Sequence, residues 1–172
     1  MNMTSIQIFD KFLPTQEEQI EIISSEEIMQ MLPHKGSAIM LDEARIIESD
    51  NRIIATYHLS PFNPAFEGHF PQAPILKGVL HIEIAAQAAI LLVKKMYPEI
   101  TGLPYLSGIG SVRFKRKVFA GDTITIIVTL MHYHKDNPKS HPFEFSFTIA
   151  KKVGDMNKEV SSGSFEGVVD RS

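Results

Sequence analysis

The segment from Gly78 to Met96 constrains the fold of this chain more than any other. It contains no proline and no second glycine, and alanine, leucine, isoleucine and valine dominate it, so it predicts a helix of about five turns. Because nearly every side of this helix would be apolar, we expect other elements to cover most of it. Glu83 and Gln87 share one of its faces. A carboxylate in such surroundings needs a basic or backbone partner, or a chemical role.

The composition predicts one domain of ordinary size. The chain has 172 residues, of which 44% are apolar, and its net charge of -3 gives no reason to expect nucleic acid or an anionic membrane as the main partner. It has no cysteine, which excludes disulfides, thiolate metal sites and thiol nucleophiles and fits a reducing compartment. The N-terminus does not read as a signal peptide, and the longest apolar run is far short of the ~20 residues that cross a bilayer. We therefore expect a cytoplasmic protein.

The chain begins with an extension of uncertain structure, residues 1–23, which shows neither a firm helical period nor a clear strand. Ser24 and Glu27 then form the pattern of a capping box and predict a short helix that ends before Pro33. There is no internal repeat, low-complexity tract or second core. Residues 24–172 are therefore expected to form a single domain.

Six segments alternate in polarity or are rich in β-branched residues, as strands are. They span residues 38–48, 52–59, 105–118, 123–134, 142–153 and 159–169. With one buried helix, they predict an α+β fold in which a six-stranded, mostly antiparallel sheet turns one apolar face to the helix. A strongly curved sheet has free edges, and pairing of edges in a dimer is a common way to cover them.

His69 lies in a loop, residues 60–74, that is rich in proline, phenylalanine and glycine and should be ordered by packing of its rings. Glu83 follows 83 − 69 = 14 residues after His69, and no local geometry brings the two side chains together. A histidine can take a proton from a carbon beside a carbonyl group, because it titrates near neutrality. A carboxyl group kept protonated by apolar surroundings can give a proton to a departing hydroxyl. Such a pair could carry out a dehydration.

The start of the long helix offers a place for the negative charge that develops on the substrate's carbonyl oxygen. Gly78 and Val79 have free backbone N–H groups there, and the glycine allows close approach. This chemistry needs no metal and no organic cofactor.

The residues from Gly68 to Gln87 carry a family resemblance. They read Gly-His-Phe-Pro-x-x-Pro-x-x-x-Gly-Val-Leu-x-x-Glu-x-x-Ala-Gln, which resembles the signature of the FabZ-type (3R)-hydroxyacyl-acyl-carrier-protein dehydratases, enzymes with the hot-dog fold. Further similar segments are Leu32–Lys35, Met40–Asp42, Arg113–Arg116 and Gly121–Asp122. Together they cover the chain from about residue 24 to 169 in the family's order.

The resemblance implies a six-stranded sheet wrapped around one central helix, and dimers, often three to a hexamer, with two active sites at each dimer interface. It implies that His69 removes the C2 proton and that Glu83, from the other subunit, is the acid partner for the C3 hydroxyl. The Gly78 N–H would polarise the thioester carbonyl, and Gln87 would support Glu83. The product would be a trans-2-enoyl thioester on acyl carrier protein, in fatty acid or related acyl-chain synthesis.

This chain departs from the family pattern at two positions. Lys77 stands where the family usually has proline, which removes a preset φ angle and adds a charge near the expected tunnel mouth. His81 stands where the family usually has an aliphatic residue.

A basic cluster allows two interpretations. Its members are Arg113, Lys115, Arg116 and Lys117. They form either a solvated strand face or, in the context of the family, the docking site for an acidic carrier protein.

The remaining histidines and aromatic residues suggest no other chemistry. His132 and His134 would point the same way from a strand, but no third metal ligand is evident, so we expect no metal site. His34, His58 and His141 are expected to make ordinary turn or surface hydrogen bonds. Phe62, Phe66 and Phe70 are expected to pack the loop and line an acyl tunnel.

Two other functions remain open at this stage. One is a hot-dog acyl-thioesterase, in which Glu83 activates water; the chain has no Gly-x-Ser-x-Gly motif for a serine hydrolase. The other is a non-catalytic paralogue that binds acyl chains, and fold alone would not exclude it.

Overall fold

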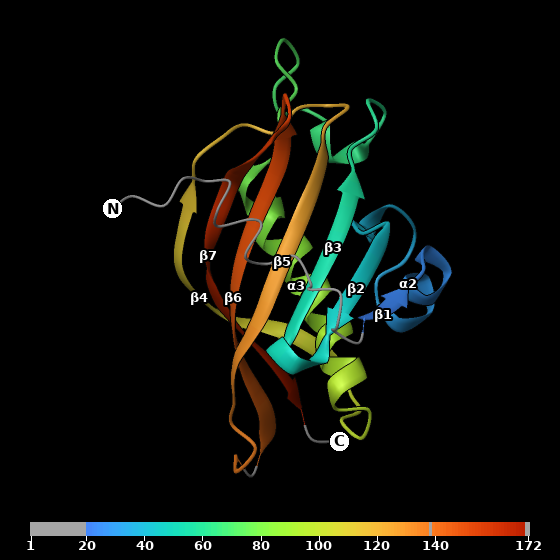
Figure 1. The fold of residues 1–172 in the computed structure, drawn as a ribbon, viewed down its shortest axis with the longest axis vertical. Helices are drawn as coiled ribbons and strands as arrows, with labels where there is room; N and C mark the ends of the chain where they lie inside the picture. The colour runs from blue at the N-terminus through green and yellow to red at the C-terminus, as the bar shows by residue number, and fades with distance from the viewer. Residues whose placement is uncertain (1–19, 138, 171–172) are drawn as a thin grey trace.

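The computed structural model describes residues 20–137 and 139–170, which form a curved antiparallel sheet around one long helix (Figure 1). In sheet order the strands are β1 (Ile20–Ile23), β2 (Glu43–Ile47), β3 (Arg52–His58), β5 (Thr123–Tyr133), β6 (Ser140–Val153), β7 (Met156–Asp170) and β4 (Pro104–Phe114). The helices are α2 (Ser25–Met31) and α3 (Gly78–Met96), and short 3-10 turns lie at Gly36–Ala38, Glu48–Asp50 and Pro64–Phe66. The predicted α+β fold is confirmed.

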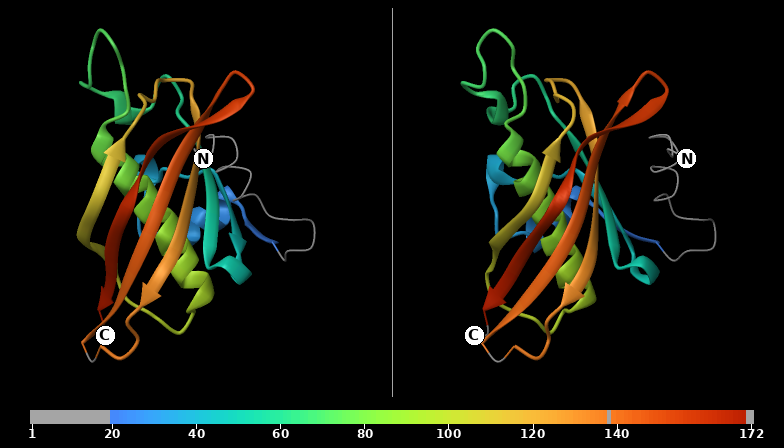
Figure 2. Two further views of the ribbon diagram at one scale, coloured as in Figure 1. Left: turned by 60° about the vertical axis from the view of Figure 1, so that its left-hand side comes forward. Right: turned by 90° about the vertical axis from the view of Figure 1, so that its left-hand side faces the viewer.

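Helix α3 begins and ends where the sequence predicts and lies across the concave side of the sheet (Figure 2). The small side chains of Ala85, Ala88 and Ala89 are buried in its contact with the core. The facing strand β5 contributes Ile124 and Ile126, which are fully buried and share one face by alternation. The predicted burial of most of this helix is therefore confirmed.

The sheet has seven strands in the described residues, not the six expected. The additional strand, β1, lies at the end of the extension 1–23 and pairs with β2, with Ile20 opposite Ile47 and Ile23 opposite Ala44. Only one of its four residues is buried, so burial of an apolar face does not hold it, and its extended form comes from pairing with a strand more than 20 residues away. The rest of the extension, residues 1–19, lies outside the described residues.

Two predicted strands are too long. The segment 38–48 becomes a strand only at Glu43, because the residues before it form a 3-10 turn and then bond to α3. The segment 105–118 ends at Phe114, where Lys115 and Arg116 turn their N–H groups to the Val160 carbonyl. Both ends depend on contacts with distant parts of the chain.

Helix α2 confirms the predicted capping box. Ser24 Oγ accepts a hydrogen bond from the Glu27 N–H at 3.3 Å, and the Glu27 carboxylate accepts one from the Ser24 N–H at 2.8 Å. Among the described residues, no helix is both long and apolar enough to span a membrane.

Two features of the fold position the candidate site. The loop between β3 and α3 projects beyond the end of the sheet, where it is drawn in green (Figure 1). At one edge of the sheet, β4 pairs with β7 and exposes the apolar side chains of Tyr105, Leu106 and Ile109. Among the described residues no strand pairs with the other side of β4, so unpaired backbone groups lie beside apolar surface.

Candidate active site

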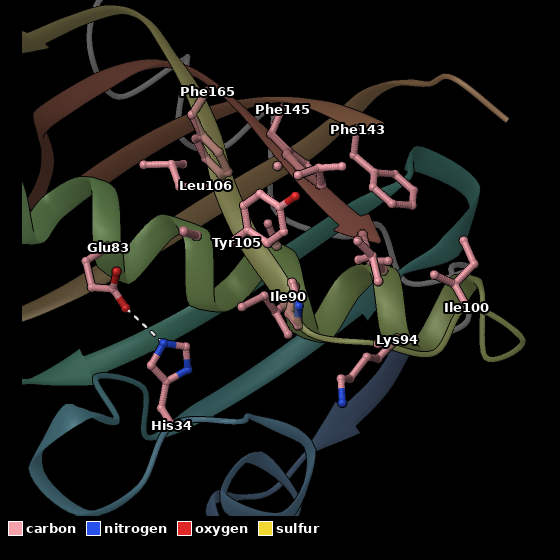
Figure 3. A pocket seen from close by; sticks show the side chains of 18 residues that line it. His34, Glu83, Ile90, Lys94, Ile100, Tyr105, Leu106, Phe143, Phe145 and Phe165 are labelled. Atoms are coloured by element: carbon pink, nitrogen blue, oxygen red, sulfur yellow. Dashed lines mark ion pairs between the residues drawn. The ribbon is translucent and has the colours of Figure 1, made fainter. Parts of the chain in front are cut away.

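A cavity of about 260 Å³ lies between α3 and strands β4, β6 and β7. The rings of Phe143, Phe145 and Phe165 form its wall on the sheet side (Figure 3). Glu83 lies at one end and Ile100 at the other. Its walls are mostly apolar and its charged groups lie at its ends, so its shape and lining suit an acyl chain whose reactive end lies beside Glu83.

Glu83 is held by a helix neighbour one turn away. Gln87 Nε2 donates a hydrogen bond of 2.8 Å to Glu83 Oε1, as the spacing of the two residues predicts. His34 Nε2 lies 3.3 Å from the same oxygen, at ion-pair distance (Figure 3). The Glu83 side chain is 41% exposed, so a single chain does not supply the apolar surroundings expected for it.

Gln87 connects α3 to the segment before β2. It is fully buried, its Oε1 accepts a hydrogen bond of 2.9 Å from the Met40 N–H, and its Nε2 also donates 2.7 Å to the Ala38 carbonyl. Every polar atom of this amide therefore has a partner, as burial requires. The same side chain that orients Glu83 fixes the turn that carries His34.

His69 is held in the projecting loop by Ile75. Its Nδ1 lies 3.0 Å from the Ile75 carbonyl oxygen, and its own carbonyl accepts the Ile75 N–H at 3.0 Å. A carbonyl oxygen can only accept, so Nδ1 carries the proton of the neutral ring and Nε2 keeps its lone pair. This is the tautomer that a general base requires. The Phe70 ring stacks on the His69 ring with 4.2 Å between centroids.

The first turn of α3 has free backbone donors. Lys77 precedes the helix without capping it, and the N–H groups of Gly78 and Val79 have no acceptor among the described residues. A Cβ on Gly78 would lie 3.3 Å from the Phe114 ring, so a larger residue at this position would press on that ring. Lys77 Nζ turns back and donates to the Glu67 carbonyl at 3.2 Å, so this lysine braces the His69 loop and does not line the cavity.

The structure of one chain does not bring the two predicted catalytic residues together. Glu83 lines the cavity, whereas His69 does not, and within the described residues no hydrogen bond or ion pair joins them.

In one chain, the phenylalanines expected to line the acyl tunnel lie away from the cavity. Phe62 is 94% exposed, Phe70 is also exposed, Phe66 is buried in the core, and none of the three lines the cavity. The rings that do line it come from β6 and β7, whose contact with α3 sequence spacing does not reveal.

The other predicted groups occupy separate places. Lys115 pairs with Glu159 at 2.7 Å, and Arg116 donates to the Glu159 carbonyl, so these two members of the basic cluster bind β7. Arg113 and Lys117 are exposed. Their predicted role in docking stays a prediction.

Of the two neighbouring histidines, His132 lies on β5 and His134 directly follows it. The rings of His132 and His134 lie 4.2 Å apart, and His134 pairs with Glu144 at 2.6 Å. Within the part of the chain that the structure describes, no group of three potential ligands could hold a metal ion. His58 and His141 make ordinary hydrogen bonds, to Thr123 and Tyr133, as expected.

His34 is the residue that sequence reasoning misplaced. It was expected at a surface turn, but it faces Glu83 and lines the cavity. The bonds between Gln87 and residues 38–40 help to hold its turn on α3, and nothing in the spacing from 34 to 83 indicates this contact.

An antiparallel sheet wrapped around a central helix, with an acidic residue at the head of an apolar cavity, fits a hot-dog enzyme of the dehydratase class. The model of the ApeI-like family, described as ApeI dehydratase, matches residues 45–164. This chain belongs to the ApeI-like dehydratase family and is a hydro-lyase. The FabZ-type resemblance is confirmed by the relatives below.

Two relatives carry the name 3-hydroxyacyl-[acyl-carrier-protein] dehydratase FabZ. The protein from Aromatoleum aromaticum is 40% identical over 107 residues, which are 60% of this chain and 74% of the relative. The protein from Mannheimia succiniciproducens is 38% identical over 121 residues, which are 69% of this chain and 80% of the relative.

A solved structure supports the fold assignment. The dehydratase heterocomplex ApeI:P from Xenorhabdus doucetiae has a TM-score of 0.66 and 20% identity, covering 84% of this chain and 91% of that one. At this identity the likeness shows the shared hot-dog fold alone.

Proposed function

We propose that the protein removes water from (3R)-hydroxyacyl thioesters carried by acyl carrier protein and releases trans-2-enoyl thioesters, in fatty acid or related acyl-chain synthesis. The observation that carries this proposal is the place of Glu83, at the head of an apolar cavity that runs along α3. The names of the FabZ relatives support the substrate class. The absence of cysteine fits the cytoplasm as its location.

The reaction breaks a C–H bond at C2 and a C–O bond at C3. The free Nε2 of His69 takes the C2 proton, the electron pair forms the C2–C3 double bond, and Glu83 gives its proton to the departing hydroxyl, which leaves as water. The N–H groups of Gly78 and Val79 bind the carbonyl oxygen, where negative charge develops as C2 loses its proton. Phe70 stacks on the base and limits its movement.

The active site is completed by a second copy of the chain. His69 of one subunit serves the Glu83 cavity of the other, because a single chain does not bring the two together. The unpaired β4 edge, with exposed Tyr105, Leu106 and Ile109, offers the surface for this contact. A homodimer is the functional unit of this proposal.

The carrier protein docks on the basic cluster. All four members are exposed, and Arg113 and Lys117, which make no ion pair among the described residues, provide positive charge for an acidic partner. The Glu159 carboxylate pairs with Lys115, and the Glu159 carbonyl accepts a hydrogen bond from Arg116. These two residues therefore contribute less to docking.

The test is hydration of a crotonyl or longer enoyl thioester by wild type, His69→Ala and Glu83→Ala, with exposed His132→Ala as control. Each site variant should lose about 10²-fold or more in kcat, and the control should lose little. Hydrolysis without hydration by the wild type would identify a thioesterase. Tight acyl-carrier binding without turnover would identify a non-catalytic paralogue.

A further inference from the structure

We propose that His34 is a positioning residue for Glu83, which fixes one carboxylate oxygen, Oε1, so that the other, Oε2, serves the substrate. The inference rests on the proposed function and adds a residue that this function does not use. His34 reaches Glu83 from the turn between α2 and β2, far from the His69 loop in sequence.

The two contacts of the carboxylate fall on the same oxygen. Gln87 Nε2 lies 2.8 Å and His34 Nε2 lies 3.3 Å from Glu83 Oε1, while Oε2 has no partner among the described residues. A carboxylate held through one oxygen by two groups has a preferred rotation, because turning it loses both contacts. Oε2 is then the oxygen that remains free for a proton transfer in the cavity. The longer contact to His34 is of the kind that tightens when substrate is bound.

The surroundings of the His34 ring determine which nitrogen carries its proton. Nδ1 is buried and has no hydrogen-bond partner within residues 20–137 and 139–170. A proton on that nitrogen would be a buried donor without an acceptor, which is costly. The proton is therefore on Nε2, which lies 3.3 Å from Glu83 Oε1, so His34 is able to donate to the carboxylate.

The turn that carries His34 is fixed on both sides. Lys35 Nζ donates to the carbonyls of Met29 and Leu32 at 3.1 and 3.3 Å and so ties the turn to the end of α2. Gln87 ties the following residues, Ala38 and Met40, to α3. The ring is thus held over Glu83, and among the described residues it has no other polar contact.

A purely structural role does not explain a histidine at this place. The buried Nδ1 has no hydrogen-bond partner among the described residues, so a nitrogen at this position does not stabilise the fold. A phenylalanine ring would occupy this place without leaving a buried polar atom unpaired. What phenylalanine cannot supply is the donor to Glu83. A functional residue that carries an unpaired buried atom lowers stability, so its replacement is expected to raise stability and to lower activity.

Two substitutions separate these roles. His34→Phe keeps the ring and removes the donor, and His34→Gln places an amide N–H near the position of Nε2. For hydration of an enoyl thioester, we expect His34→Phe to lower kcat about 10- to 100-fold with little change in KM, as for loss of a hydrogen bond to a charged group. Its melting temperature should stay equal or rise. His34→Gln should recover most of kcat.

A third comparison shows whether His34 acts through Glu83. In a Glu83→Gln background, His34→Phe should cause no further loss, because the group that it positions is gone. Wild-type kcat in His34→Phe would overturn the inference, as would an equal loss in His34→Phe and His34→Gln with lowered melting temperatures. Additive losses in the double variant would also overturn it. Failure of the wild type to hydrate any enoyl thioester would instead refute the proposed function.

Discussion

His81 on α3 and Ser161 on β7 share a hydrogen bond of 2.9 Å between two buried side chains. His81 is 3% exposed and Ser161 is fully buried, and the Phe114 ring meets the imidazole edge-on at 5.5 Å. Burial lowers the pKa of His81 to about 4, so the ring is neutral at physiological pH. The unusual histidine in this helix is therefore a polar link between helix and sheet, and it does not line the cavity.

The buried His81 predicts a loss of stability in mild acid. Its pKa is about 4 when folded and about 6.5 when unfolded, so the unfolded chain binds more protons between these values. The stabilisation that neutral His81 gives to the folded state is fully present above pH 6.5, and it is lost as the pH falls toward 4. We expect roughly 2 kcal/mol less unfolding free energy at pH 5 than at pH 7 from this group, measured by urea titration.

The matched control for this pH effect is His81→Leu combined with Ser161→Ala, because removing the histidine alone would leave a buried hydroxyl unpaired. The double variant should lack the His81 part of the difference between pH 7 and pH 5. An unchanged difference would show that other groups cause the acid sensitivity.

Replacing Gln87 should affect stability and activity together. Gln87→Ala leaves the Met40 N–H and the Ala38 carbonyl without their partner and frees Glu83. We expect a loss of about 2–4 kcal/mol in unfolding free energy and a lower kcat, measured by urea unfolding and enoyl-thioester hydration. The exposed Gln30→Ala on α2 is the control and should change neither. A stable, inactive Gln87→Ala would mean that it only orients Glu83.

Mixed dimers test whether the site is shared between subunits. When His69→Ala and Glu83→Ala chains are co-expressed with different tags, the mixed dimer has one site with both groups intact and one with neither. Random pairing should restore about a quarter of the wild-type activity, and purified mixed dimers about half. If each site used both residues of one chain, the mixture would stay as inactive as either variant alone.

The basic cluster should govern the response to the carrier protein. Arg113→Ala with Lys117→Ala should raise KM roughly tenfold for a carrier-bound substrate at low salt and leave KM for a small pantetheine thioester unchanged. Salt should reduce the difference. Arg45→Ala with Lys139→Ala removes the same charge from other exposed positions and should have no such effect. An equal rise in KM for both substrates would argue against docking at this cluster.

Local patterns were enough to predict those elements that depend on neighbouring residues. The bounds of α3, the capping box of Ser24 and Glu27, and the Glu83–Gln87 bond all follow from contacts within four residues. Strand β1 could not be predicted from neighbouring residues, because only one of its four side chains is buried and it needs β2 as a partner. The early part of the segment 38–48 was misassigned because Gln87 takes the Met40 N–H that a strand would have used.

The sequence by itself determined the central helix and the family, and it predicts His69 and Glu83 as the base and the acid. Only the tertiary structure decided that His34 faces Glu83, that aromatic rings of β6 and β7 line the cavity, and that His69 lies outside it in a single chain. The reason is physical. Residue types and short spacings set local conformation, whereas contacts between distant segments depend on how the whole sheet curves around α3.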